Sequence, residues 1–438
     1  MKRYSEYKDS GVKWIGEIPR HWECRKLKTL LLSPLQYGAN ASGVPYSEHL
    51  PRYIRITDIT LEGKLKHSDK LSLSNEDAAK YILKDKDILF ARSGASVGKT
   101  FLYKKEYGLS AFAGYLIKAE LGKELIPELL FYFTQSDIYE SWKNGIFIQS
   151  TIQNIGADKY SQLQIALPPL PEQEAIVTYL DTKVAKIDEY ISIAEKKIAA
   201  LEELKQTIIA EAVTRGIHKD VPMKDSGVKW IGMIPEHWKI MRLRFVCEFR
   251  NGYTPSKANP KFWENGTIPW FRMEDIRDSG RFLNEAKQYI SKEAVKGDGL
   301  FEAGSFILAT TATIGEHAML IADSLANQQF TNLKIRKSLI SKLSRNFFFY
   351  YLFVIDEYCK STTRKATFPS VDMTDLKNIG VSIPPIEEQQ EIVTYLDSKV
   401  ANINQLCQAE RSQIEKLKEY KQRLISDVVT GKVKVTND

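Results

Sequence analysis

The chain has 438 residues, enough for two to four domains that each bury their own core. Hydrophobic residues make up 43% and charged residues 27%, as in soluble globular proteins, and no apolar run is long enough to cross a membrane. The formal net charge of +7 favours a polyanionic partner. The N-terminus lacks the apolar core of a signal peptide and no C-x-x-C pair occurs, so we expect a cytoplasmic protein with reduced thiols.

The sequence repeats itself at a fixed distance. KDSGVKWIG occupies residues 8–16 and again 224–232, and IP-x-HW follows each copy. PP-x-x-EQ-x-x-IVTYLD occupies residues 168–181 and 384–397, and the offset is constant, since 224−8 and 384−168 both equal 216. A period of this length predicts a duplicated, pseudo-symmetric architecture with two comparable functional ends.

The first part of each repeat predicts an α/β or α+β domain. Segments rich in β-branched and aromatic residues predict strands over residues 52–59, 87–94, 267–276 and 305–312. Longer apolar segments predict buried helices over residues 124–137 and 345–357.

The second part of each repeat predicts a long helix. Between Pro171 and Gly216 the sequence contains no glycine or proline, and apolar residues recur every three or four positions. This heptad-like spacing is typical of a helix that packs along its length on another helix, here over roughly 65 Å. The predicted seam of the first helix is Ile176, Leu180, Val184, Ile187, Ile191, Ala194, Ile198, Leu201, Leu204 and Ile208. That of the second helix is Ile392, Leu396, Val400, Ile403, Cys407, Ile414, Leu417, Tyr420 and Leu424.

Each long helix needs a partner for its apolar stripe. We expect the two helices to form an antiparallel coiled coil with one α/β domain at either end; the alternative is that each helix folds back on its own domain. The predicted domains are residues 1–168, a helical region 169–216, residues 217–384 and a helical region 385–438.

The sequence offers no convincing catalytic constellation. SGASVGKT at residues 93–100 nearly matches a phosphate-binding loop, but a strand rather than a helix is predicted after it, and residues 311–318 of the second copy read TATIGEHA. Two of the six histidines, His21 and His237, recur at the offset, within motifs that look structural, and no metal-ligand spacing is visible. We therefore expect no catalytic site, no cofactor and no metal.

The duplicated GVKWIG-x-IP-x-HW and PP-x-x-EQ-x-x-IV-x-YLD motifs, together with two dissimilar α/β regions, resemble the specificity subunit of type I restriction–modification systems. The resemblance covers essentially the whole chain. It implies a non-catalytic subunit whose two target recognition domains each read one half of a bipartite double-stranded DNA sequence. It also implies a coiled coil that sets the half-site spacing and docks two methyltransferase subunits, with restriction–translocase subunits joining the full complex and no membrane involved.

Polar and basic residues in loops between apolar strands are the candidates for DNA contact, because Arg, Lys, Asn and Gln read base edges and small polar residues bind phosphates. In the first domain they are Arg55, Arg92, Ser93, Lys99, Lys143, Asn144, Gln149, Ser150 and Thr151. In the second domain they are Arg250, Asn251, Arg272, Thr310, Thr311, Gln328, Gln329, Arg364, Lys365 and Thr367.

The repeated tryptophans allow two interpretations. Trp14, Trp22, Trp230 and Trp238 could stack on bases, but they recur identically in two domains that should read different sequences, so we expect them to pack at the domain base. Two competing functions remain open: a nucleotide-dependent enzyme that uses residues 93–100, and a coiled-coil adaptor without DNA specificity.

Overall fold

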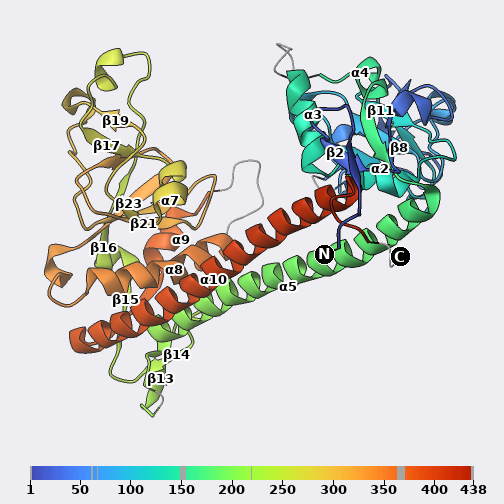
Figure 1. Ribbon diagram of the computed structural model, residues 1–438. Coiled ribbons are helices and arrows are strands. Elements are labelled where there is room, and N and C mark those ends of the chain that lie inside the picture. The colour runs from blue at the N-terminus through green and yellow to red at the C-terminus, as the bar shows by residue number, and fades with distance from the viewer. Residues whose placement is uncertain are drawn as a thin grey trace. The chain divides into compact units, whose positions relative to one another are not determined.

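The computed structural model describes residues 2–60, 63–66, 68–147, 154–218, 220–362 and 370–435 (Figure 1). The chain divides into two compact units. Unit 1 consists of Met1–Glu195 and Arg411–Asp438, and unit 2 of Lys196–Glu410. Each unit therefore combines one α/β region with a stretch of both long helices, α5 (Leu170–Arg215) and α10 (Ile386–Val429).

The main sheet of each unit has the same strand order. In unit 1 the neighbouring strands are antiparallel and run β4 (Gln36–Tyr37), β11 (Leu116–Ala119), β8 (Ile88–Ala91) and β9 (Thr100–Leu102). In unit 2 the order is β16 (Cys247–Asn251), β23 (Phe330–Ile335), β20 (Phe306–Ala309) and β21 (His317–Leu320), with β18 (Phe282–Leu283) added at the edge. Every residue of β8 and β20 is buried, which explains their uninterrupted apolar sequences.

A second sheet packs beside the main one in each unit. In unit 1 its order is β10 (Ser110–Phe112), β6 (Arg52–Ile54), β7 (Leu71–Ser72) and β5 (Val44–Pro45). In unit 2 it is β22 (Leu325–Ala326), β17 (Ile268–Phe271) and β19 (Tyr289–Ile290). The β10–β6 and β22–β17 pairs are both parallel. The two units thus share a topology although their sequences differ.

Helices cover the main sheets, and here the sequence-based expectations need correction. The helix expected over residues 124–137 is α2 (Pro127–Phe133), followed by a separate α3 (Asp137–Phe147), whereas unit 2 has one continuous α8 (Arg345–Thr362). The strand expected up to residue 276 ends at Phe271, and α7 (Met273–Ser279) follows. The Asp275 side chain accepts a hydrogen bond from the Arg272 amide and so caps this helix.

The beginning and end of each α/β region pair with each other. Strand β3 (Glu23–Lys26) is antiparallel to β12 (Gln164–Leu167), and β15 (Lys239–Arg242) is antiparallel to β24 (Gly380–Ile383). The hairpins β1 (Tyr7–Asp9)–β2 (Glu17–Pro19) and β13 (Met223–Asp225)–β14 (Met233–Pro235) precede these pairs and carry the repeated motif. Each region therefore closes immediately before its long helix begins.

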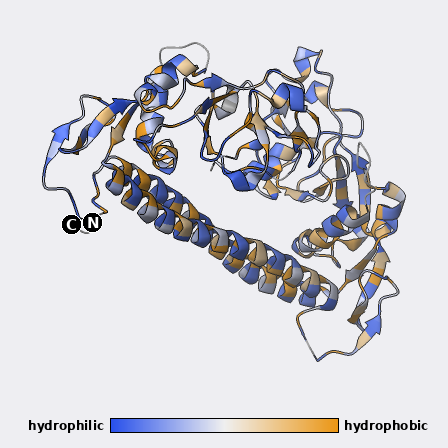
Figure 2. Cartoon of the chain, turned by 90° about the vertical axis from the view of Figure 1, so that its right-hand side faces the viewer, coloured by the Kyte–Doolittle hydropathy of each residue, from blue (hydrophilic) through white to orange (hydrophobic). Residues whose placement is uncertain are grey.

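In each unit a stretch of α5 packs beside a stretch of α10, and apolar and polar positions alternate along both helices (Figure 2). Within unit 1 Lys421 Nζ donates to Asp188 Oδ1 at 2.6 Å, and within unit 2 Lys205 Nζ donates to Asn404 Oδ1 at 3.2 Å. Lys205 and Lys421 are 216 residues apart, as are Asp188 and Asn404, so the two contacts are equivalent.

The predicted seam is wrong at two equivalent positions. Leu204 and Tyr420 are each 48% exposed, whereas the aliphatic stems of the following residues, Lys205 and Lys421, are largely buried. The other seam positions are buried or half-buried. No helix in the described part of the chain is both long and apolar enough to span a membrane.

Candidate nucleic-acid interface

The repeated motif at the start of each long helix forms a joint with the α/β region. Glu172 Oε2 accepts a hydrogen bond from Trp22 Nε1 at 2.9 Å and lies 2.9 Å from His21 Nε2. In unit 2 Glu388 Oε2 accepts from Trp238 Nε1 at 3.0 Å and lies 2.8 Å from His237 Nε2. The motif therefore serves the internal structure of each unit.

The tryptophans of this motif are packing residues, as expected. Trp22 and Trp238 are fully buried. Trp14 and Trp230 are half-buried against Phe133 and Tyr358, with ring centroids 6.4 and 5.8 Å apart. The two buried rings cannot stack on a base, and the two half-buried rings pack against the core of their unit.

Unit 1 brings several polar side chains together where strands of the main sheet end. We call this group, which comprises Tyr37, Arg92, Ser93, Tyr115 and Asn154, the strand-end cluster of unit 1. The Arg92 amide, just after β8, donates to the Tyr115 carbonyl at 3.0 Å, and the Arg92 carbonyl accepts from the Ile155 amide at 2.8 Å. Ser93 forms a β-bridge with Asn154. The Arg92 guanidinium lies over the Tyr37 ring, 4.9 Å from its centroid, at the end of β4. Tyr115 is 63% exposed, so the cluster presents an aromatic and a cation to solvent.

Unit 2 has the same two backbone hydrogen bonds and the same β-bridge at the equivalent place, and we call this shared set of contacts the backbone frame. The Thr310 amide donates to the Gln329 carbonyl at 2.9 Å, and the Thr310 carbonyl accepts from the Val371 amide at 2.9 Å. Thr311 forms the β-bridge, here with Ser370. Thr310 and Gln329 are thus equivalent to Arg92 and Tyr115 of unit 1. Together with Thr311 and Ser370 they form the strand-end cluster of unit 2.

In both units a glycine at the end of the first strand of the main sheet packs closely against a neighbouring backbone segment. A Cβ atom on Gly38 would lie 2.4 Å from the Ala113 carbonyl oxygen, and one on Gly252 would lie 2.1 Å from the Asn327 carbonyl oxygen. Only glycine allows this approach of two strands. The residues before these glycines are equivalent, so Tyr37 in unit 1 corresponds to Asn251 in unit 2.

Three arginines that are predicted to contact DNA have partners within the protein. Arg55 forms a 2.8 Å ion pair with the buried Asp58, and Arg272 pairs with Glu274. Arg250 donates to the carbonyls of residues 298–300 and lies 4.5 Å from the centroid of the Phe301 ring. The sequence showed their charge but not these partners.

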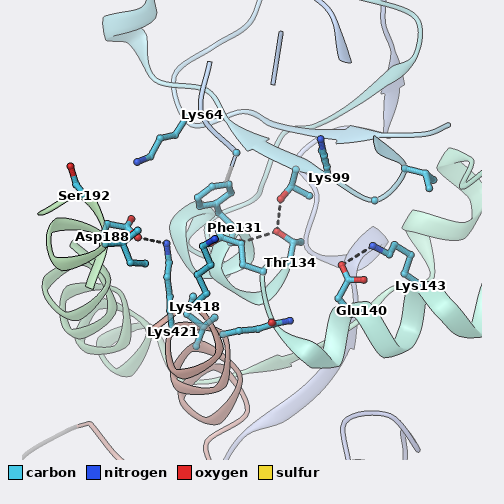
Figure 3. A pocket seen from close by; sticks show the side chains of 18 of the residues that line it. Lys64, Lys99, Phe131, Thr134, Glu140, Lys143, Asp188, Ser192, Lys418 and Lys421 are labelled. Atoms are coloured by element: carbon cyan, nitrogen blue, oxygen red, sulfur yellow. Dashed lines mark hydrogen bonds and ion pairs between the residues drawn. The ribbon is translucent and has the colours of Figure 1, made fainter. Parts of the chain in front are cut away.

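Two predicted lysines lie elsewhere, in a cleft of about 720 Å³ within unit 1 between the α/β region and stretches of both long helices (Figure 3). Lys99 and Lys143 line it, and Lys143 Nζ forms a 2.6 Å ion pair with Glu140. Lys421 and Asp188 contribute their ion pair from the helices. Because carboxylates line this cleft together with lysines, it is a weaker candidate for a DNA surface than the strand-end cluster.

The remaining candidates divide between exposed residues and residues outside the described part of the chain. Asn144 and Gln328 are exposed, and the Gln328 side-chain oxygen accepts from Thr254 Oγ1 at 2.5 Å. Gln149, Ser150, Thr151, Arg364, Lys365 and Thr367 lie outside the described residues. Sequence reasoning missed Tyr37, Tyr115, Asn154 and Ser370, because a single aromatic or small polar residue near a strand end carries no distinctive pattern.

The near match to a phosphate-binding loop is a turn between strands. A short 3-10 turn, η3 (Gly94–Ser96), is followed by β9 from Thr100 onward, so no helix N-terminus is available to hold phosphates. Among the described residues, no group of three or more His, Cys, Asp and Glu side chains is placed to hold a metal ion.

Comparisons with known proteins identify the family. The model of the type I restriction modification DNA specificity domain matches residues 53–203 and 235–416. A putative type I restriction enzyme MjaX specificity subunit from Methanocaldococcus jannaschii is 26% identical over 98% of both chains. The EcoprrI specificity subunit from Escherichia coli is 45% identical over 159 residues, which cover 35% of this chain and 40% of that relative.

A solved structure, described in terms of complex assembly and conformational transition of the type I R-M system, shows the same fold. It is 20% identical, covers 95% of this chain and 99% of its own, and gives a TM-score of 0.71. The chain therefore belongs to the type I restriction–modification DNA specificity family, whose members are non-catalytic components that recognise DNA sequences.

Proposed function

We propose that each unit of this chain reads one half of a bipartite double-stranded DNA target through its strand-end cluster. The observation that carries the proposal is the shared backbone frame at Arg92 and Thr310, which holds different side chains in the two units. A common scaffold with different polar groups is what two readers of different sequences require. In this proposal residues 1–168 and 217–384 are the recognition domains.

We further propose that α5 and α10 form one antiparallel coiled coil that sets the distance between the half-sites. Support comes from the equivalent Lys205–Asn404 and Lys421–Asp188 contacts and from the buried seam of each helix. In this arrangement residues 169–216 and 385–438 are the helical spacers, and a pseudo-twofold axis relates the units. Two-headed proteins of this kind suit DNA targets that are split into two half-sites.

The outer faces of these helices are the proposed docking surface for two methyltransferase subunits. Leu204, Leu406 and Tyr420 are each close to half exposed on helices whose seams are otherwise buried. A partner that docks on this face would bury these apolar side chains and so gain binding free energy. We place the complex in the cytoplasm, where restriction–translocase subunits would join it and partner subunits would methylate adenine or cut DNA.

Co-expression with the methyltransferase subunits, followed by methylome sequencing, tests the proposal. We expect methylated adenines within a single bipartite motif, with two specified parts separated by unspecified bases. Methylation without sequence preference would support the adaptor alternative instead. No methylation beyond that of the methyltransferase subunits alone would contradict the proposed function.

A further inference from the structure

One guanidinium in the strand-end cluster of unit 1 is left without an anionic partner. Among the residues that the structure describes, Arg92 forms neither an ion pair nor a side-chain hydrogen bond, and its Nε is buried without a partner. The other predicted arginines that the structure describes, Arg55, Arg250 and Arg272, are bound to carboxylates or carbonyls. A partly exposed guanidinium with no carboxylate partner keeps its N–H donors available for a ligand that accepts hydrogen bonds.

The protein holds this guanidinium in a fixed orientation. Hydrogen bonds to Tyr115 and Ile155 restrain the Arg92 backbone on both sides. The guanidinium carbon lies over the Tyr37 ring, and the Tyr37 hydroxyl is itself fixed, because it accepts a hydrogen bond from the Ala157 amide at 3.0 Å. Arginine prepared in this way loses little entropy on binding, as a base-reading group should.

The comparison with unit 2 distinguishes base reading from phosphate binding. A phosphate contact carries no sequence information, so two units that dock on the same DNA backbone would both need it. The equivalent residue in unit 2 is Thr310, which is buried and hydrogen-bonded to Thr331 Oγ1 at 3.0 Å. The guanidinium is therefore specific to unit 1, as expected of a group that reads a base present in one half-site only.

We propose that Arg92 is a specificity-determining residue that reads a guanine in the half-site of unit 1, donating two hydrogen bonds to the O6 and N7 atoms in the major groove. A planar guanidinium donates to both acceptors at once in a fixed geometry, whereas a lysine ammonium can reach them only as a flexible point charge. Tyr37 is the positioning residue that holds it. This inference rests on the proposed function of the chain as a DNA reader.

The test uses the full chain in complex with its methyltransferase subunits. The variants are Arg92→Thr, which introduces the residue that unit 2 tolerates in the same frame, and Arg92→Lys, which keeps the charge. Arg20→Gln is the control, because Arg20 is exposed and its substitution removes the same charge from unit 1. Binding is measured to a duplex that carries the motif identified by methylome sequencing. It is measured again to duplexes in which 7-deazaguanine, which lacks N7, replaces each guanine of the motif in turn.

We expect one guanine, in one half-site, whose replacement weakens binding by the wild type and by Arg20→Gln about tenfold or more. Arg92→Thr should bind the unmodified duplex and the duplex with 7-deazaguanine at this position equally, and methylome sequencing of its complex should show that the motif is relaxed at that position alone. Arg92→Lys should lose part of the discrimination, because its ammonium can still donate to N7 or O6 but without the fixed geometry of a guanidinium. The inference is overturned if no 7-deazaguanine affects the wild type, or if Arg92→Thr weakens binding to every duplex equally, as loss of a phosphate contact would. Loss of sequence-dependent binding by the wild type would instead contradict the proposed function.

Discussion

At the scale of single residues, one buried glutamine in each unit ties the long helix to the α/β region. Gln173 Nε2 donates to the carbonyls of Glu124 and Pro168 at 2.8 and 2.9 Å, and its Oε1 accepts from the Ile126 amide at 2.9 Å. Gln389 makes the corresponding three hydrogen bonds in unit 2. Both side chains satisfy backbone groups that would otherwise be buried without partners.

The substitution Gln173→Met tests this joint. Methionine fills a similar volume but leaves the Ile126 amide unpaired, so we expect the free energy of unfolding to fall by about 3 kcal/mol. Gln413→Met, at an exposed position of α10 in the same unit, should change it by less than about 0.5 kcal/mol. Urea denaturation followed by circular dichroism measures both, and equal effects of the two substitutions would refute the assigned role.

Unit 2 contains a buried histidine, His317, whereas the described histidines of unit 1, His21 and His49, are exposed. His317 Nδ1 lies 2.6 Å from Asp356 Oδ2, and Arg281 donates to the His317 carbonyl at 2.8 Å and pairs with Glu316 at 2.7 Å. In the described part of unit 2, His317 Nε2 has no hydrogen-bond partner. Burial lowers the pKa of His317 below its usual value, although the neighbouring Asp356 opposes this shift.

This depressed pKa predicts a pH dependence. The folded state holds His317 neutral, while the unfolded chain takes up a proton below about pH 6.5. The contribution of neutral His317 to the free energy of unfolding is therefore fully present above that pH and is lost as the pH falls. We expect the unfolding free energy of unit 2 to fall by up to about 1.4 kcal/mol per pH unit below pH 6.5. His317→Gln should reduce this slope, measured by urea denaturation between pH 7.5 and 5.5, and an unchanged slope would contradict the assignment.

The sequence could single out candidate residues by type and position, but not the partners that distant segments bring to them. Arg92 and Thr310 were both among the predicted DNA contacts, and the structure places them in equivalent positions of the two units. Arg250 was also predicted, but its carbonyl partners lie about fifty residues away and no pattern announces them. Tyr37 and Tyr115 were missed because aromatic residues near strands are usually core residues.

At the scale of elements, the two long helices are amphipathic, and their stability comes from the buried seam. Apolar periodicity was sufficient to predict both helices, which the structure places at Leu170–Arg215 and Ile386–Val429. It could not predict the shift at Leu204 and Tyr420, because the stem of a lysine can replace an apolar side chain in a seam while its ammonium reaches a partner. Short capped turns such as α7 were also missed, because they depend on a single aspartate.

Two leucines of α10 separate the inner and outer faces of this helix. Leu396 is fully buried and Leu406 is 49% exposed. Leu396→Ala should lower the unfolding free energy of unit 2 by about 2–5 kcal/mol through the cavity it leaves. Leu406→Ala should leave stability nearly unchanged.

The same leucine pair tests the proposed docking surface. Leu406→Ala should weaken binding of the methyltransferase subunits, measured by isothermal titration calorimetry, if the exposed face of α10 contacts them. Unchanged affinity would remove Leu406 from that surface without affecting the stability argument for Leu396.

At the scale of the whole molecule, a 216-residue repeat accounts for the organisation of the chain. Segments that repeat closely, including Glu172 and Glu388 with their tryptophan partners, form the joints of the two units. Segments that repeat only in outline share a topology and a strand-end frame but differ in the side chains that they present. The repeat was therefore enough to predict duplication and fold class. The side chains that each strand-end cluster exposes could be identified only from the structure.

The most direct test of this account exchanges residues 24–165 for the corresponding segment of a relative with a known target. The chimaera is co-expressed with the methyltransferase subunits, and the host methylome is sequenced. We predict that one half of the bipartite motif changes to that of the relative while the other half remains. A change in both halves, or in neither, would contradict the claim that each unit reads its own half-site.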